Sequence, residues 1–344
     1  MRVRSFLLSL RFSRRPAHAR SFPGTLEDAA FRSQLPRHAE NDRAGSATAV
    51  LSRGRGEGYA RGVTYLDGPR PRLFAHRGAS GVVPENTIEA FAAGLAAGAD
   101  RLELDVHSTK DGEIVVFHDN FLDRTTDGIG PIDSWHTGEL RRLNAGYHFV
   151  DASGNHWRDR HLRIPTLAEV LEEFPDTPLN IEIKADNGST IERYFDLLDR
   201  YDARDRVLSA AFEDAILERI RTVAPRAITS LSADEVFQFF SCCMNGSFDG
   251  YVPPGKALQV PPEHDGIEVV SAAFVAAAHA LDMEVHVWTI NDEPEMERLL
   301  DLGIDGLMSD FPGRARAVFE RRGLREPAAP GKAARSRIAR SRIA

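Results

Sequence analysis

The sequence predicts an α/β fold, a single-domain (β/α)8 TIM barrel, and three observations support this prediction. From residue 72 onward, short runs with strand-like composition alternate with runs of helical periodicity. About eight strands are expected over roughly 250 residues, which is the usual size of such a barrel. An open doubly wound sheet is the alternative, but the turn after the first strand, at 76–81, lacks the G-x-G-x-x-G spacing of a dinucleotide-binding sheet.

The individual elements are predicted from local patterns. Strands are expected at 73–76, 101–106, 114–118, 179–184, 207–210, 227–231, 284–290 and 305–309. Helices are expected at 87–97, 166–174, 190–201, 213–223, 233–240, 272–281, 293–302 and 314–321. Asn86, followed by Glu89 three residues later, is interpreted as the capping box of the first helix. A loop rich in Gly, Asp and Thr is expected over 119–134, and the Gly- and Pro-rich stretch 244–268 receives no assignment.

The two ends of the chain differ in charge from its middle. The chain has 344 residues and a net charge of −8, yet residues 1–72 hold 14 Arg against 6 Asp or Glu. The tail 324–344 holds 6 Lys or Arg and one Glu, so the middle carries −21. We therefore expect a basic extension over 1–71 that is disordered or a targeting segment, a barrel over 72–323, and a basic disordered tail over 324–344.

This charge distribution narrows the classes of partner and location. An acidic body argues against nucleic acid, because binding DNA or RNA needs a basic surface that neutralises phosphates. It suits a protein that binds metal cations and a small-molecule substrate. No apolar stretch approaches the ~20 residues that span a bilayer, so no integral membrane segment is expected. The two cysteines, Cys242 and Cys243, are adjacent and form no disulfide framework, which fits a cytoplasmic location.

Two carboxylates in one predicted strand are the strongest sign of chemistry. Glu103 and Asp105 alternate with Leu102, Leu104 and Val106. A period of two places both acids on the same face of the strand, about 6–7 Å apart. Burying two like charges is costly unless a cation pairs with them. An exposed strand face is the alternative, but barrel strands are covered on both sides.

The strand at 179–184 repeats this arrangement with Glu182 and Lys184. One interpretation is a plain Glu–Lys ion pair that fills the barrel. The other is a third carboxylate beside Glu103 and Asp105. Three carboxylates with no thiol nearby favour a hard divalent cation, Mg²⁺ or Ca²⁺, over zinc.

Further polar residues fall at the carboxyl ends of predicted strands, where TIM-barrel active sites lie. His76 and His118 are both in such positions, and a histidine pair is suited to acid–base catalysis near neutral pH. Arg77 offers a bidentate fork for phosphate. Trp288 is assigned either to rim packing or to substrate contact. Three other histidines are interpreted as incidental: His107, His136 and His264.

Taken in order, these residues resemble the glycerophosphodiester phosphodiesterase family over about residues 72–323, in the form of its short bacterial cytosolic members. The motifs are His76-Arg77-Gly78, Pro84-Glu85-Asn86-Thr87, Glu103-Leu104-Asp105-Val106, Thr109-Lys110-Asp111-Gly112, His118-Asp119, Arg124-Thr125-Thr126-Asp127-Gly128, Ile164-Pro165-Thr166-Leu167, Glu182-Ile183-Lys184, Trp288-Thr289-Ile290-Asn291 and Asp305-Gly306 to Asp310. Each motif alone is weak, whereas the ordered set is specific.

The resemblance implies a (β/α)8 barrel that hydrolyses glycerophosphodiesters to glycerol 3-phosphate and an alcohol. It implies one divalent cation on Glu103, Asp105 and Glu182. It implies His76 and His118 as acid and base. It also implies that Arg77 and Lys184 hold phosphate oxygens. The sequence departs from the family pattern at no catalytic position.

Three other functions are considered. The first is a lysophospholipase D or sphingomyelinase D on the same barrel, which would need an apolar lip. Phe239, Phe240 and Phe248 could form such a lip, although core packing is the favoured account. The second is a barrel that binds phosphodiesters without cutting them, which would lack a carboxylate or a histidine. The third is a barrel tethered to a partner through its basic ends.

Overall fold

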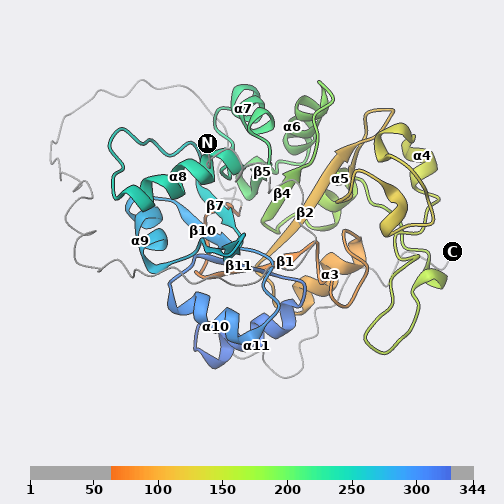
Figure 1. The fold of residues 1–344 in the computed structure, drawn as a ribbon. Helices are drawn as coiled ribbons and strands as arrows, with labels where there is room; N and C mark the ends of the chain where they lie inside the picture. Colours follow the sequence, from red (N-terminus) through yellow and green to blue (C-terminus); the bar gives the residue numbers. More distant parts are fainter. Residues whose placement is uncertain (1–62, 327–344) are drawn as a thin grey trace, which may run out of the picture.

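The computed structural model of the protein describes residues 63–326. Within this range, eight parallel strands form a barrel surrounded by helices (Figure 1). The strands are β1 (Arg72–His76), β2 (Arg101–Ser108), β4 (Leu179–Ile183), β5 (Val207–Ala210), β6 (Ile228–Thr229), β7 (Ala257–Val260), β10 (Glu284–Val287) and β11 (Gly306–Ser309). β1 pairs with both β2 and β11, and a bridge between Ser230 and Ala257 joins β6 to β7. The predicted TIM barrel is therefore confirmed.

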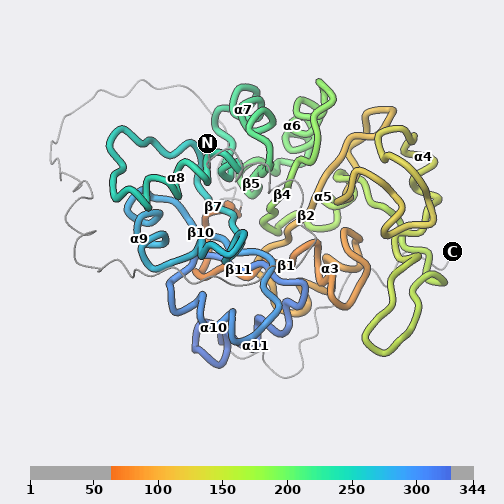
Figure 2. The backbone as a smooth tube through the Cα atoms, viewed as in Figure 1, coloured from red at the N-terminus to blue at the C-terminus, as the bar shows by residue number. Residues whose placement is uncertain are grey.

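A helix packs outside the barrel after each parallel strand, as the tube in Figure 2 also shows. These helices are α3 (Ile88–Ala96), α5 (Leu167–Glu173), α6 (Thr190–Arg200), α7 (Asp214–Val223), α8 (Ala233–Asn245), α9 (Ala272–Ala280), α10 (Glu293–Asp301) and α11 (Pro312–Arg321). Strand periodicity separates the two sides of the wall: Leu102, Leu104 and Val106 belong to the core beneath the helices. No helix in the range 63–326 has the length and apolar character needed to cross a bilayer.

A long insertion between β2 and β4 stands beside the barrel (Figure 1). It contains β3 (Ile114–Val116), the short helix α4 (Thr137–Leu140) and the 3-10 turns η1 (Leu122–Arg124), η2 (Ile132–Ser134) and η3 (Arg158–Arg160). The insertion has a small core of its own, which includes Phe117, Leu122 and Ile132. This core fixes the segment that follows β3, which carries His118 to the mouth of the barrel.

One strand predicted for the barrel wall lies outside it, and one wall strand was left unassigned. The strand predicted at 114–118 does not belong to the barrel wall, because β3 pairs antiparallel with the end of β2. The missing wall strand is β7, which lies inside the unassigned stretch 244–268. β7 has four residues and is followed at once by Pro261, Pro262 and the hairpin β8 (Glu263–His264) to β9 (Ile267–Glu268). Its pattern is too short to distinguish from a loop.

The predicted capping role of Asn86 is also wrong. The N-cap of α3 is Thr87, whose side chain accepts a hydrogen bond from the amide of Ala90. Asn86 instead adopts a left-handed backbone conformation with φ of 56°, which Asn tolerates better than most residues. Its side chain is thereby released from the helix and points into the barrel.

The amino-terminal end of the barrel is closed by residues that precede β1. Tyr65 is fully buried there, and its hydroxyl donates to Oδ1 of Asn180 at 3.2 Å. The guanidinium of Arg101 donates to the carbonyl of Tyr65 at 2.6 Å, and that of Arg72 pairs with Glu284 at 3.1 Å. Residues 63–71, assigned by sequence to the N-terminal extension, thus contact the barrel.

At the other end of the described range, Arg325 pairs with Asp100 at 2.6 Å. The predicted disorder or targeting of residues 1–62, and the predicted disorder of 327–344, lie outside the residues that the structure describes.

Candidate active site

Every candidate site residue lines one cavity at the carboxyl ends of the strands. The cavity has a volume of about 740 Å³. The eight candidates on its wall are His76, Arg77, Glu103, Asp105, His118, Glu182, Lys184 and Trp288. They come from β1, β2, β4, β10 and the segment after β3, so only the closed barrel brings them together.

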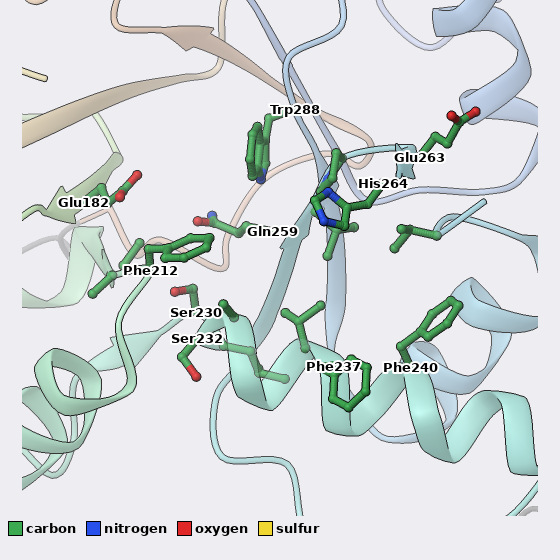
Figure 3. Close-up of a pocket in the computed structure, with 18 of the residues that line it drawn as sticks. Glu182, Phe212, Ser230, Ser232, Phe237, Phe240, Gln259, Glu263, His264 and Trp288 are labelled. Atoms are coloured by element: carbon green, nitrogen blue, oxygen red, sulfur yellow. The ribbon is translucent and has the colours of Figure 1, made fainter. Parts of the chain in front are cut away.

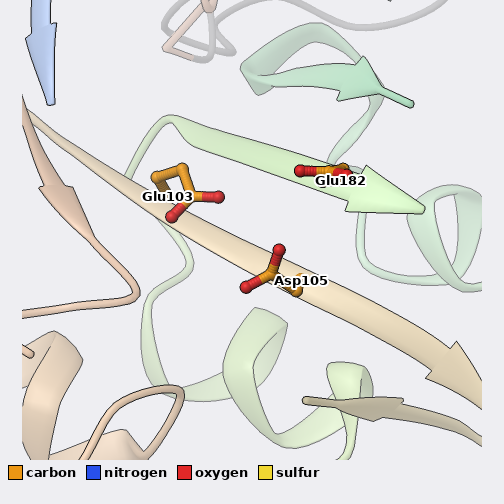
Figure 4. Close-up of side chains that lie close together, drawn as sticks. All are labelled: Glu103, Asp105 and Glu182. Carbon is orange, nitrogen blue, oxygen red and sulfur yellow. The ribbon is translucent and has the colours of Figure 1, made fainter. Parts of the chain in front are cut away.

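Three carboxylates form the floor of this cavity (Figure 4). The register of β2 and β4 sets Asp105 directly opposite Glu182, and Glu103 lies two residues earlier on the same face of β2. One oxygen of each side chain lies within 4.8 Å of the others. Glu103 and Asp105 are 4 % and 1 % exposed, whereas Glu182 is partly exposed to the cavity. Three converging carboxylate oxygens could hold a divalent cation.

Basic groups offset part of this buried negative charge. Lys184 Nζ lies 3.0 Å from Asp105 and 2.9 Å from Glu182, and Arg77 Nε lies 3.4 Å from Asp105. Burial would raise the pKa of Asp105, but the charges of Lys184, His118 and Arg77 outweigh it and hold the pKa low. Glu103 differs, because burial and the charge of Asp105 raise its pKa well above the ordinary range.

A further contact that orients a carboxylate of the cluster comes from Asn86. Its amide Nδ2 donates to Oδ2 of Asp105 at 2.9 Å, and the residue is 3 % exposed. The Arg77 amide likewise donates to Oε2 of Glu103 at 2.8 Å. Both carboxylates of β2 are therefore held in fixed orientations by the loop between β1 and α3. Apart from its place in the Pro84–Thr87 motif, no sequence signal predicts this role of Asn86.

His76 stands between the carboxylate cluster and a second acid. Its Nδ1 lies 2.7 Å from Oδ1 of Asp310, and its Nε2 lies 3.9 Å from Oε2 of Glu103. Asp310 also accepts hydrogen bonds from Ser80 and Asn291. Burial lowers the pKa of His76, but the Glu103 charge and the Asp310 hydrogen bond outweigh it, so its pKa is raised overall. Asp310 therefore orients the ring and favours its protonated form.

His118 is oriented by its neighbour, and that neighbour belongs to a chain of ion pairs. His118 Nδ1 lies 2.6 Å from Oδ1 of Asp119. Arg124 holds Asp119 at 2.5 Å and, with two nitrogens, Glu85 at 2.7 Å. Glu85 in turn accepts a 3.0 Å hydrogen bond from Arg77. This series of ion pairs links His118, a candidate catalytic residue, to Arg77, a candidate phosphate-binding residue. This linking role of Glu85 and Arg124 was not predicted from the sequence.

The three histidines interpreted as incidental lie elsewhere. Nε2 of His107 lies 3.2 Å from the carbonyl of His118, so His107 supports the backbone beside the site. His136 is an exposed residue near Asp111, and His264 lies on β8.

Comparison with known proteins matches this arrangement to a family. Residues 76–314 match the model of the glycerophosphoryl diester phosphodiesterase family. The chain belongs to this family. A glycerophosphodiester phosphodiesterase from Bacillus altitudinis is 33 % identical over 260 residues, which cover 72 % of this chain and 98 % of that protein.

Two further proteins to which this chain is similar are informative. A phosphodiesterase of Oleispira antarctica, whose structure contains sn-glycerol-3-phosphate, is 28 % identical with a TM-score of 0.59. The match covers 73 % of this chain and 97 % of that one. Lysophospholipase D GDPD1 of Homo sapiens is 28 % identical over 265 residues, covering 71 % of this chain and 84 % of that protein. The relatives of this chain thus include proteins named glycerophosphodiester phosphodiesterase and lysophospholipase D.

Within this phosphodiesterase family, the geometry can support hydrolysis of a phosphodiester. A cavity floor that could hold a cation lies beside two histidines, each with one ring nitrogen on a carboxylate and the other available for proton transfer. Arg77 and Lys184 add positive charge at the same floor. Trp288, 37 % exposed, stands on the cavity wall, where it can contact a substrate.

Proposed function

We propose that this protein hydrolyses glycerophosphodiesters to glycerol 3-phosphate and an alcohol, with a divalent cation on Glu103, Asp105 and Glu182. The observation that carries the proposal is the convergence of these carboxylates within 4.8 Å in a cavity that His76 and His118 also line. The names of the Bacillus altitudinis and Oleispira antarctica relatives support the substrate class.

The cation is Mg²⁺ or Ca²⁺ in this proposal. The ligands are carboxylate oxygens, which hard cations prefer, and neither cysteine lines the cavity. The raised pKa of Glu103 fits the same reading, because a cation would relieve the repulsion between Glu103 and Asp105. When bound, the cation would neutralise the charge that develops on the phosphate.

The other side chains that line the cavity have separate roles in the proposed reaction. Arg77 and Lys184 bind non-bridging phosphate oxygens, and Trp288 contacts the substrate at the rim. One histidine takes the proton of the attacking hydroxyl while the other protonates the leaving alcohol. If the attacking hydroxyl is the glycerol 2-hydroxyl, a cyclic phosphate forms and is hydrolysed with the two histidines in reversed roles. Direct attack by water is the other route, and trapping of a cyclic glycerol phosphate distinguishes the two.

Release of glycerol 3-phosphate tests the function directly. Glycerophosphocholine and glycerophosphoethanolamine are incubated with the protein in EDTA, Mg²⁺, Ca²⁺ or Mn²⁺. The proposal expects release that EDTA abolishes and one cation restores. It also expects Glu103→Gln and Glu182→Gln to need more cation for half-maximal activity. Equal rates in all four conditions would remove the cation from the proposal, and no release from either diester would remove the substrate class.

The location proposed for this protein is the cytoplasm. The free cysteines Cys242 and Cys243 are compatible with a reducing cytoplasm. The proposed partner is a small-molecule diester. A barrel that binds diesters without cutting them is disfavoured, because both histidines and all three carboxylates are present in one cavity.

A further inference from the structure

Two amide side chains line the deep part of the active-site cavity. Asn180 comes from β4 and Gln259 from β7, and we call them the amide pair. Asn180 precedes Glu182 by two residues, so both side chains lie on the same face of β4, and it stands opposite Glu103 on β2. The amide pair therefore lies one layer of side chains below Glu182, toward the amino-terminal end of the barrel. No step of the proposed reaction uses either side chain.

Gln259 also lies where a second, mainly apolar cavity joins the active-site cavity. This apolar groove has a volume of about 340 Å³ and lies between α8 and the β8–β9 hairpin (Figure 3). Glu182, Phe212, Gln259 and Trp288 line both spaces. In Figure 3, the amide end of Gln259 points to the side on which Glu182 lies, near the rings of Phe212 and Trp288. Its polar atoms thus lie among large apolar groups, where a hydrogen-bonding atom without a partner is costly.

Hydrogen bonds within the barrel fix the orientation of both amides. Nε2 of His286 lies 2.9 Å from Oε2 of Glu284, so the imidazole donates and the carboxylate accepts. Burial lowers the pKa of His286, so the ring is neutral near pH 7 and its Nδ1 is an acceptor. This Nδ1 lies 3.3 Å from Nε2 of Gln259, and the same Nε2 donates to Oδ1 of Asn180 at 2.6 Å. The nitrogen of the Gln259 amide therefore faces His286 and Asn180.

The other atom of each amide has no hydrogen-bond partner among residues 63–326. Oδ1 of Asn180 accepts from Gln259 and, at 3.2 Å, from the hydroxyl of Tyr65, whereas Nδ2 of Asn180 donates to no described group. Oε1 of Gln259 likewise accepts from no described group. Asn180 is only 2 % exposed, yet neither free atom is fully enclosed by protein, so both face the cavity. One donor and one acceptor from two hydrogen-bonded side chains match a hydroxyl group, which both donates and accepts.

We propose that the amide pair binds the terminal hydroxyl of the glycerol in a glycerophosphodiester, and thereby selects glycerol over alcohols that lack this group. This inference rests on the proposed function and names the residues that recognise its substrate. Five bonds separate the terminal oxygen from phosphorus, and they span about 6 Å when extended. The two-residue step along β4 from Glu182 to Asn180 covers about the same length. The hydroxyl donates to Oε1 of Gln259 and accepts from Nδ2 of Asn180, while the phosphate lies at the carboxylates.

A substrate series tests the proposal in the presence of the activating cation. Glycerophosphocholine is compared with two analogues that keep the 2-hydroxyl: one has hydrogen in place of the terminal hydroxyl, and the other carries a methyl ether there. The kcat/KM is expected to fall about 10- to 100-fold for the deoxy analogue, because the amide atoms lose their partner. The methyl ether cannot donate to Gln259, so its kcat/KM should fall at least as far. Equal values for all three substrates overturn this inference and leave the proposed function standing. No cleavage of any diester overturns the proposed function, and this inference with it.

Gln259→Met tests the assignment to the amide pair, because methionine has nearly the same length and no amide. The variant is expected to lower kcat/KM for glycerophosphocholine at least ~10-fold and to leave kcat/KM for the deoxy analogue nearly unchanged. The ratio of the two values does not depend on how much of the variant is folded, so a loss of stability cannot imitate this result. Gln238→Met is the matched control, since Gln238 is exposed on α8 and lines neither cavity. Its ratio should equal that of the unchanged protein.

The same measurements distinguish substrate contact from two other roles of Gln259. An equal loss for glycerophosphocholine and the deoxy analogue would show that Gln259 only supports its neighbours, which overturns the proposal. A higher cation requirement with both substrates would make Oε1 of Gln259 a cation ligand and would overturn it as well. Asn180→Leu removes the proposed donor and is expected to lower the same ratio at least ~10-fold. A ratio equal to that of the unchanged protein in Gln259→Met overturns the assignment.

Discussion

Both ends of the barrel interior carry buried charged side chains. The two ends differ in whether these side chains are paired with groups of opposite charge or face an open cavity. At the amino-terminal end, Arg72 pairs with Glu284 at 3.1 Å, and His286 lies 2.9 Å from the same carboxylate. Tyr65 is fully buried at this end, and its residues line neither the 340 Å³ nor the 740 Å³ cavity. At the carboxyl end, Glu103 and Asp105 are equally buried, but they face a cavity of about 740 Å³.

We infer from this difference that the buried charges at the amino-terminal end stabilise the fold, whereas those at the carboxyl end serve a reaction. At the closed end each acidic group has a cation and hydrogen bonds that stay in place, so removing one partner leaves the other buried and alone. At the open end the pKa of Glu103 is raised, because burial and Asp105 destabilise its charged form. An open site with unbalanced carboxylates suits an incoming cation and substrate. Substitutions at the open end should therefore cost activity, and substitutions at the closed end should cost stability.

The largest effect is expected from the histidines of the open end. His76→Ala and His118→Ala should each lower kcat at least ~10²-fold, because each removes a group that transfers a proton. Their unfolding curves should stay close to that of the unchanged protein. His136→Ala is the control, since His136 lies on the surface away from the cavity. A near-normal kcat in either variant would remove that histidine from the reaction.

The next effect belongs to the closed end. Glu284→Gln should lower the free energy of unfolding by about 3 kcal/mol or more, because Arg72 would keep a buried charge without its partner. The kcat of the folded fraction should be unchanged. Denaturant unfolding and steady-state kinetics measure the two quantities. Glu182→Gln at the open end should give the reverse result, and similar behaviour of both variants would contradict the distinction between the ends.

A smaller effect is expected from Asn86, which orients a proposed cation ligand. Asn86→Gly keeps the left-handed backbone and removes the amide that donates to Asp105. The cation concentration for half-maximal activity should rise about 10- to 100-fold, the usual cost of losing a group that orients a metal ligand. Asp202→Gly is the control, because Asp202 also has positive φ but is exposed and remote. Equal cation requirements in both variants would remove Asn86 from this role.

The smallest effect is expected from Tyr65. Tyr65→Phe removes one buried hydrogen bond to Asn180 and should lower the free energy of unfolding by about 1 kcal/mol. The aromatic ring would still close the end of the barrel, so kcat should not change. A loss of activity without a loss of stability would show that the closed end contributes to the site.

Much of the site could be predicted from residue type and spacing. A period of two in β2 puts Glu103 and Asp105 on one face, and the alternation of strands and helices predicts a barrel whose strand ends meet. The prediction of the barrel wall was wrong where one local sequence pattern is compatible with two positions of a strand. The run at 114–118 has the composition of a wall strand, and only its antiparallel pairing with β2 places it outside the wall.

Asn86 shows the same limit at one residue. A polar residue before a helix is equally compatible with capping that helix and with turning away from it. Burial beside Asp105 decided between them, since the carboxylate needs a donor and Thr87 already caps the helix. Contacts between residues far apart in the chain carry this information, and no short window of sequence contains them.

The sequence by itself determined the family, the alternation that makes a barrel, and the chemical types of the groups that line its mouth. These follow from local properties: side-chain period, residue type and the order of motifs. The tertiary structure alone decided that Asp105 lies opposite Glu182, that Glu85 and Arg124 join His118 to Arg77, and that an apolar groove opens beside Glu182. Those features depend on strand register and barrel closure, which fix the positions of distant residues through packing.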